Sequence, residues 1–228
     1  MNSTSESIYE NICRARNQRE ELPLEYSLPT EEASSPDKPR FADGALDGIA
    51  LYHMGAPDQD ASLLKQAVDA AATDLDQAHE LIGRWVTDGH MISVMNKVLQ
   101  YVIERQQQLP PSEIYRLAAE CVLKGAHREE VKLGLVLLAL FDTDQNEPLK
   151  NALRILALSD EFTLYVVQVA ATWTKSSQEI LRIAKAVHGW GRIHAVAALE
   201  PDTQDIADWL FTEGWNNTIL PAYSALEC

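Results

Sequence analysis

The most distinctive polar residues in this sequence surround Gly189-Trp190-Gly191-Arg192, which lies between His188 and His194. The apolar segment 192–199 follows directly, and its composition predicts a short helix that Pro201 ends. Free backbone N–H groups at the start of a helix, together with an arginine, can hold a carboxylate or a phosphate. The alternative is structural: the glycines allow a tight turn, and Arg192 pairs with a nearby acid.

The stretch 142–146 (DTDQN) begins like a calcium-binding loop, with oxygen-bearing side chains at its first, third and fifth positions. The sixth position is Glu147, where the loop needs a glycine, and the twelfth is Leu153, where a bidentate glutamate belongs. The pattern therefore predicts a turn between helices and not a calcium site.

No other pattern identifies a reaction. The six histidines form no HExxH motif and no metal-like spacing with Cys13, Cys121 or Cys228. The sequence has no P-loop, no GxSxG and no GxGxxG that opens a strand–helix unit. We therefore predict no catalytic, cofactor-binding or metal-ligating residue, and the sequence favours a protein that is not an enzyme.

Helical periodicity accounts for most of the chain. Apolar residues at Ile180, Ile183, Ala184 and Val187 follow the i, i+3, i+4, i+7 pattern of one helix face. The same reasoning predicts an all-α fold with the following helices: 62–72, 75–88, 90–107, 112–124, 129–141, 147–158, 161–173, 176–187, 192–199 and two more after Pro201. The segment 41–54 is ambiguous because Gly44 and Gly48 weaken a helix.

Consecutive helices pair as hairpins, an amphipathic one followed by a more uniformly apolar one, at irregular spacing. With segment 192–199 as an example of the inner helix, residues 60–228 resemble the HEAT and armadillo-like α-solenoids. The resemblance implies helical hairpins stacked into a right-handed superhelix over a repeat domain, 42–228. Members of this superfamily are mostly protein-binding scaffolds, and a few act on nucleic acid or attach chromophores.

Residues 1–41 differ from the rest of the chain. A short helix is possible between Glu6 and Leu22, and the Pro, Ser, Glu and Asp residues that follow favour an extended or disordered segment. We expect a flexible N-terminal arm, partly disordered. It either stays loose or docks through Leu24, Tyr26 and Leu28.

The charge of the chain narrows the choice of partners. The formal charge is −15 at pH 7, and no Lys or Arg follows Arg192. Nucleic acids and anionic membranes repel such a surface, because binding to them depends on Lys and Arg. A basic protein segment is compatible with it, and acidity that only aids solubility is the plainer alternative.

No secretory signal is visible, and the longest apolar run, 133–141, is too short to span a bilayer. Widely separated cysteines suit a reducing compartment, with Cys121 as a small core residue. We therefore expect a cytoplasmic protein.

Four of the five tryptophans lie at or after Trp173. Stacked helices could bring them into one groove, where Trp is a frequent binding hot spot, or they could fill gaps in the core. The residues that we predict to bind a partner are Trp190, Arg192, His194, Trp209, Trp215, Asp202, Asp205 and Asp208.

The function expected from these features is a non-enzymatic interaction or scaffold module with a protein or peptide partner, a basic segment being favoured. One alternative is a helical-repeat enzyme of the DNA-alkylation-repair type, which the acidic charge disfavours. Another is a structural N-terminal part of a larger chain. The last helix is apolar-faced through Leu226 and lacks a polar capping repeat, which predicts such a fragment or a homodimer through this end.

Overall fold

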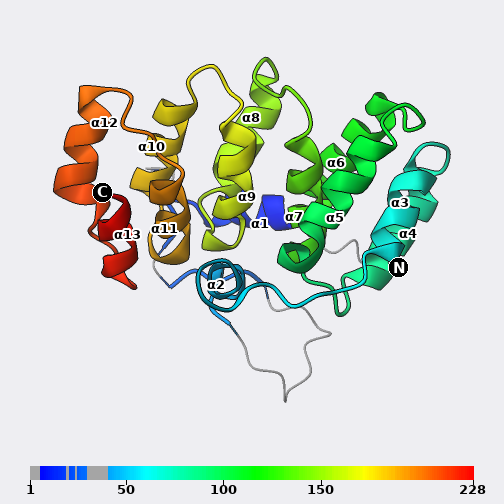
Figure 1. Cartoon of the computed structure of the whole chain (residues 1–228), viewed down its shortest axis with the longest axis horizontal. Coiled ribbons are helices and arrows are strands. Elements are labelled where there is room, and N and C mark those ends of the chain that lie inside the picture. The colour runs from blue at the N-terminus through cyan, green and yellow to red at the C-terminus, as the bar shows by residue number, and fades with distance from the viewer. Residues whose placement is uncertain (1–5, 19–20, 24, 30–40) are drawn as a thin grey trace. The chain divides into compact units, whose positions relative to one another are not determined.

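The computed structural model describes residues 6–18, 21–23, 25–29 and 41–228, and all regular structure in these ranges is helical (Figure 1). Most of the segment predicted to be disordered lies outside the described residues. The described helices are α1 (Ile8–Ala15), α2 (Ala45–Ile49), η1 (Ala50–Met54), α3 (Ser62–Ala71), α4 (Leu75–Trp85), α5 (Met91–Glu104), α6 (Pro111–Lys124), α7 (Arg128–Leu138), α8 (Glu147–Leu156), α9 (Asp160–Ala170), α10 (Ser176–Ala186), α11 (Gly189–Ala197), α12 (Gln204–Trp209), η2 (Leu210–Gly214) and α13 (Pro221–Glu227).

The chain forms two compact units. Of the described residues, unit 1 comprises 6–10, 29 and 49–141, and unit 2 comprises 11–18, 21–23, 25–28, 41–48 and 142–228. The prediction of an arm over 1–41 and one repeat domain over 42–228 stays a prediction. The all-α fold is confirmed for the described residues, including the valine-rich segment of α9.

In unit 1 α3 packs against α4, and α6 packs against α7 as predicted for the hairpin 112–141. The two members of the second pair bury different amounts of surface. Helix α6 buries one face, including Leu117 and Cys121, whereas α7 is buried from Val131 to Leu138. An amphipathic helix that covers one buried along most of its length gives the α6–α7 pair its core.

A buried ion pair holds the start of α7 in unit 1. Lys132 Nζ lies 2.9 Å from Glu129 Oε1, and the two side chains are 1% and 6% exposed. The other oxygen of Glu129 accepts the N–H of Met91, the first residue of α5, at 2.6 Å. One carboxylate thus neutralises a buried cation and caps a neighbouring helix.

In unit 2 the pairs are α8 with α9 and α10 with α11, and α9 also packs against α11. Helices α9 and α11 are buried along nearly their whole length. They are the inner helices of unit 2, as α7 is of unit 1.

The segment 41–48 belongs to this core because its two glycines allow close contact. Gly44 has φ +73° and donates its N–H to Glu161 Oε2 at 2.8 Å. A Cβ at Gly48 would lie 2.1 Å from the ring of Trp190, so only glycine fits there. Tyr165 donates its hydroxyl to buried Asp47 at 3.1 Å. The glycines that weaken the local helix are the ones that tertiary packing needs.

Among the described residues, no helix is both long enough and apolar enough to cross a membrane.

Removal of one partner of the Glu129–Lys132 pair should lower the free energy of unfolding markedly. We expect Lys132→Met to lower the free energy of unfolding by about 3 kcal/mol, because it leaves the buried carboxylate without its cation. Adding Glu129→Gln to it should restore part of the loss. Chemical denaturation of both variants measures the effect.

The control is Lys124→Met, since Lys124 forms an exposed pair with Glu120 in the same unit. Lys124→Met should lower the free energy of unfolding by no more than about 1 kcal/mol. Equal effects of the two lysine substitutions would contradict the assigned role of the buried pair.

Candidate functional site

The Gly189-Trp190-Gly191-Arg192 stretch starts helix α11, three residues earlier than predicted from the sequence. Gly189 has φ +69°, which favours glycine and lets the chain turn directly from α10 into α11. The sequence indicated that this helix start can hold a carboxylate. The carboxylate that lies there is the protein's own Asp160, to which the backbone N–H groups of Trp190 and Gly191 donate.

Asp160 fills the space above this helix start. A Cβ at Gly189 would lie 2.2 Å from one oxygen of Asp160, and a Cβ at Gly191 would lie 2.6 Å from the other. Burial raises the pKa of the Asp160 carboxyl to about 7, the two backbone N–H donors oppose that rise, and Asp43 and Glu161 add to it. This helix start therefore has no room for an external anion.

Three of the predicted partner-binding residues are buried, which corrects their assignment to a surface. Trp190, Arg192 and His194 are 7%, 6% and 2% exposed. Trp190 packs against Gly48 and stacks on His194, with 6.3 Å between ring centroids. Arg192 donates to the backbone carbonyl of Glu213 at 2.7 Å and not, as predicted, to an acid.

The other five predicted residues reach the surface. Asp202, Asp205, Asp208 and Trp215 are exposed, and Trp209 is half-buried. The Trp209 ring lies under two cations, with the Arg192 guanidinium 5.1 Å and the Lys185 ammonium 5.9 Å from its centroid.

Two further apolar side chains lie in this region, and the sequence analysis did not single out Phe211. Phe211 is 81% exposed, Leu226 is 84% exposed and Trp215 is 48% exposed. Helical spacing puts Asp208, Phe211 and Trp215 on one side of α12 and η2. The end of α13 lies against the end of η2, because a Cβ at Gly214 would be 2.9 Å from Cys228 Sγ.

We define the acidic–aromatic surface by three exposed aspartates and three exposed apolar residues of the segment 202–226. Its members are Asp202, Asp205, Asp208, Phe211, Trp215 and Leu226. Two of the acids are held in place: Ser177 donates to Asp202 at 2.7 Å, and Gln204 donates to Asp208 at 2.7 Å.

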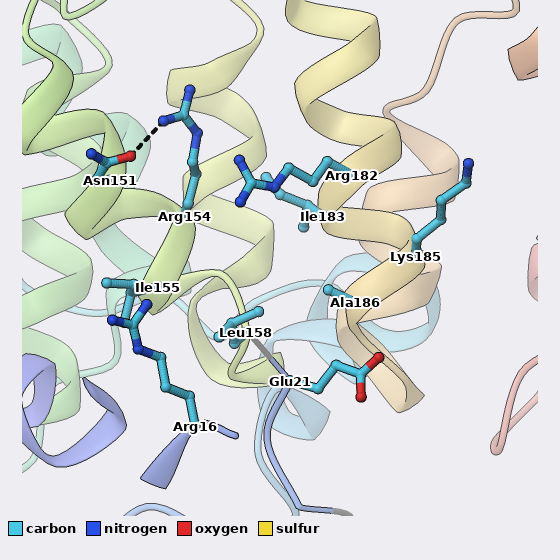
Figure 2. A pocket seen from close by; sticks show the side chains of 10 residues that line it. All are labelled: Arg16, Glu21, Asn151, Arg154, Ile155, Leu158, Arg182, Ile183, Lys185 and Ala186. Carbon is cyan, nitrogen blue, oxygen red and sulfur yellow. Dashed lines mark hydrogen bonds between the residues drawn. The ribbon is translucent and has the colours of Figure 1, made fainter. Parts of the chain in front are cut away.

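A pocket of about 450 Å³ in unit 2 lies between α8, α10 and the N-terminal segment. Figure 2 shows Arg182 extending from α10 in the direction of α8, while Lys185 points away from it. The lining residues are Arg16, Glu21, Asn151, Arg154, Ile155, Leu158, Arg182, Ile183, Lys185 and Ala186.

Arg154 is the most firmly held cation of the pocket. Its guanidinium donates to Glu179 at 2.6 and 3.0 Å, to Asn151 at 2.7 Å and to Glu147 at 3.2 Å (Figure 2 draws the contact with Asn151). It also lies over the Trp173 ring, 5.7 Å from the centroid.

Sequence reasoning missed this pocket, although a signal was present. Asn151, Arg154, Ile155 and Leu158 follow the i, i+3, i+4, i+7 spacing of one helix face. Arg182, Lys185 and Ala186 follow i, i+3, i+4 on the next outer helix. Two neighbouring outer helices with basic faces predict a basic strip between them.

Comparisons with models of known protein families, with curated protein sequences and with solved structures found no match to this chain.

The raised pKa of Asp160 predicts a pH dependence of stability. The carboxyl ionises near 3.8 in the unfolded chain and at about 7 in the folded protein, so between these values the folded state binds one more proton. The free energy of unfolding should therefore fall as pH rises across this window. Asp160→Asn should flatten that slope in denaturation experiments at several pH values.

The exposed variant Asp205→Asn should keep the wild-type slope. A slope that Asp160→Asn leaves unchanged would show that Asp160 does not titrate in this window.

Proposed function

We propose that this chain is a non-enzymatic protein-binding module built from stacked helical hairpins of the HEAT and armadillo-like kind, and that its acidic–aromatic surface binds a basic, amphipathic segment of a partner protein. The observation that carries the proposal is the exposure of Phe211 and Leu226, 81% and 84%, in a C-terminal segment whose aspartates are also exposed. Large apolar side chains surrounded by one sign of charge are typical of interaction sites.

The charges of this region support a basic partner. No Lys or Arg follows Arg192 in the sequence, and Arg192 itself is buried. Asp202, Asp205 and Asp208 therefore have no cation on α12, η2 or α13 to offset them. An uncompensated acidic patch attracts basic segments and speeds their encounter, and this effect weakens as salt is added.

The apolar residues supply the affinity that charge alone does not. Burial of a Phe or Leu side chain is worth roughly 2 kcal/mol, and aromatic residues are common hot spots in interfaces. Phe211 on η2 and Trp215, the residue that follows η2, are four residues apart, so an amphipathic helix of the partner can cover both with residues one turn apart.

The enzyme alternative of the DNA-alkylation-repair type finds less support. Such an activity requires a basic groove that contacts phosphates. The aromatic side chains exposed in this region, Phe211 and Trp215, are accompanied by acids, and the basic pocket of unit 2 is of a size for a small ligand.

A synthetic peptide pair tests the proposal: an amphipathic helix of Leu and Lys, and the same sequence with Glu in place of Lys. The Lys peptide should bind and lose affinity with added salt, and the Glu peptide should not. The double variants Asp205→Asn/Asp208→Asn and Phe211→Ala/Trp215→Ala should each weaken the Lys peptide about tenfold or more. Fluorescence anisotropy of the labelled peptide measures each affinity.

Matched controls lie elsewhere in the chain. Asp76→Asn/Glu80→Gln removes two exposed charges from α4, and Phe41→Ala removes an exposed aromatic ring of unit 2. Both should bind the Lys peptide like the wild type. If these control variants lost as much affinity as those of the acidic–aromatic surface, the peptide would bind through general charge attraction and not at the proposed site.

A further inference from the structure

Unit 1 brings together three side chains that are each common metal ligands. His79 comes from α4, Cys121 from α6 and Glu130 from α7, and one ligand atom of each lies within 4.8 Å of the others. The sequence analysis found no metal-like spacing between histidine and cysteine, because these residues are far apart in the chain and only the packing of three helices joins them.

The close packing of α6 on α7 positions two of these residues. A Cβ at Gly134 would lie 2.7 Å from the carbonyl oxygen of Ala118 and 2.9 Å from Cys121 Cβ, so α7 approaches α6 where only glycine fits. A Cβ at Gly125 would lie 3.3 Å from the carboxyl carbon of Glu130. The two glycines let the thiol and the carboxylate approach each other from adjacent helices.

His79 lies between two glutamates. Its Nδ1 is 3.5 Å from Glu130 Oε1, and its Nε2 is 3.4 Å from Glu120 Oε2. The Nε2 atom is buried, and Glu120 is its partner. In metal sites a ligating histidine commonly directs its second nitrogen at a carboxylate, which fixes the ring. Glu120 is placed for that role.

Two carboxylates, Glu130 and Glu120, lie near the Cys121 thiol. Burial raises the pKa of its thiol well above the ordinary value, and the charges of Glu130 and Glu120 raise it further. The thiol therefore keeps its proton unless a positive charge stabilises the thiolate. A divalent metal ion provides that charge, and binding releases the thiol proton to solvent.

We propose that His79, Cys121 and Glu130 bind a zinc ion, through the Nδ1, Sγ and carboxylate oxygen atoms, and that this ion ties α4 to the α6–α7 hairpin of unit 1. Tetrahedral zinc with bonds of about 2.0–2.3 Å holds its ligand atoms about 3.3–3.8 Å apart, so atoms that now lie up to 4.8 Å apart approach one another by about 1 Å. A thiolate with an imidazole selects zinc over calcium or magnesium. Water completes the fourth position, because Glu120 lies at the other nitrogen of the His79 ring.

The site can be reached from solvent. The side chains of His79 and Glu130 are 29% and 20% exposed, while Cys121 is fully buried. Zinc can therefore enter along the two exposed ligands without unfolding of the unit.

Cobalt serves as the spectroscopic probe in the full-length variant Cys13→Ala/Cys228→Ala, whose single remaining thiol is Cys121. Titration with cobalt should produce the charge-transfer absorption of a cobalt–thiolate bond with one ion per chain, and zinc should abolish it. Further substitution Cys121→Ala should remove the absorption. Absence of the band with Cys121 as the sole cysteine would overturn the proposal.

Zinc affinity, measured by chelator competition, separates a metal site from a set of ion pairs. His79→Gln and Glu130→Gln should each abolish tight binding, and Glu120→Gln should weaken it about tenfold or more. Zinc should also raise the melting temperature of the wild type and not that of Cys121→Ala. Destabilisation by His79→Gln without any zinc binding by the wild type would show that His79 acts only in ion pairs.

Discussion

Carboxylates in the first turns of the inner helices hold the backbone amides at the starts of neighbouring segments. The first N–H groups of a helix lack partners within it, and leaving them unpaired in a protein interior is costly. Glu129 of α7 accepts the N–H of Met91, Glu161 of α9 accepts that of Gly44, and Asp160 accepts those of Trp190 and Gly191. Both units use this device, with acids that occupy the same place in α7 and α9.

This constraint determines which residues remain for a partner. Because Asp160 and Gly48 fix the start of α11, Trp190, Arg192 and His194 become part of the core of unit 2. Beyond α11 the acids Asp202, Asp205 and Asp208 and the aromatic side chains Phe211 and Trp215 are exposed, and we place the proposed interaction there.

Local patterns predicted the helices and their pairing, because apolar spacing and proline breaks depend on near neighbours. They also indicated that the start of the 189–197 helix can hold a carboxylate. The identity of that carboxylate, Asp160, could not be predicted, since it depends on the packing of α9 against α11. The approach of His79 to Cys121 and the packing of Trp190 on Gly48 could not be predicted for the same reason, because each joins residues that are far apart in the chain.

Amide hydrogen exchange in the native protein, followed by NMR, tests the central role of these carboxylates most directly. The amides of Met91, Gly44, Trp190 and Gly191 should exchange slowly, although they lie in first turns or just before one, whereas that of Ser112 in the exposed first turn of α6 should exchange fast. Glu129→Ala should speed exchange at Met91. Exchange at these four amides as fast as at Ser112 would contradict the account.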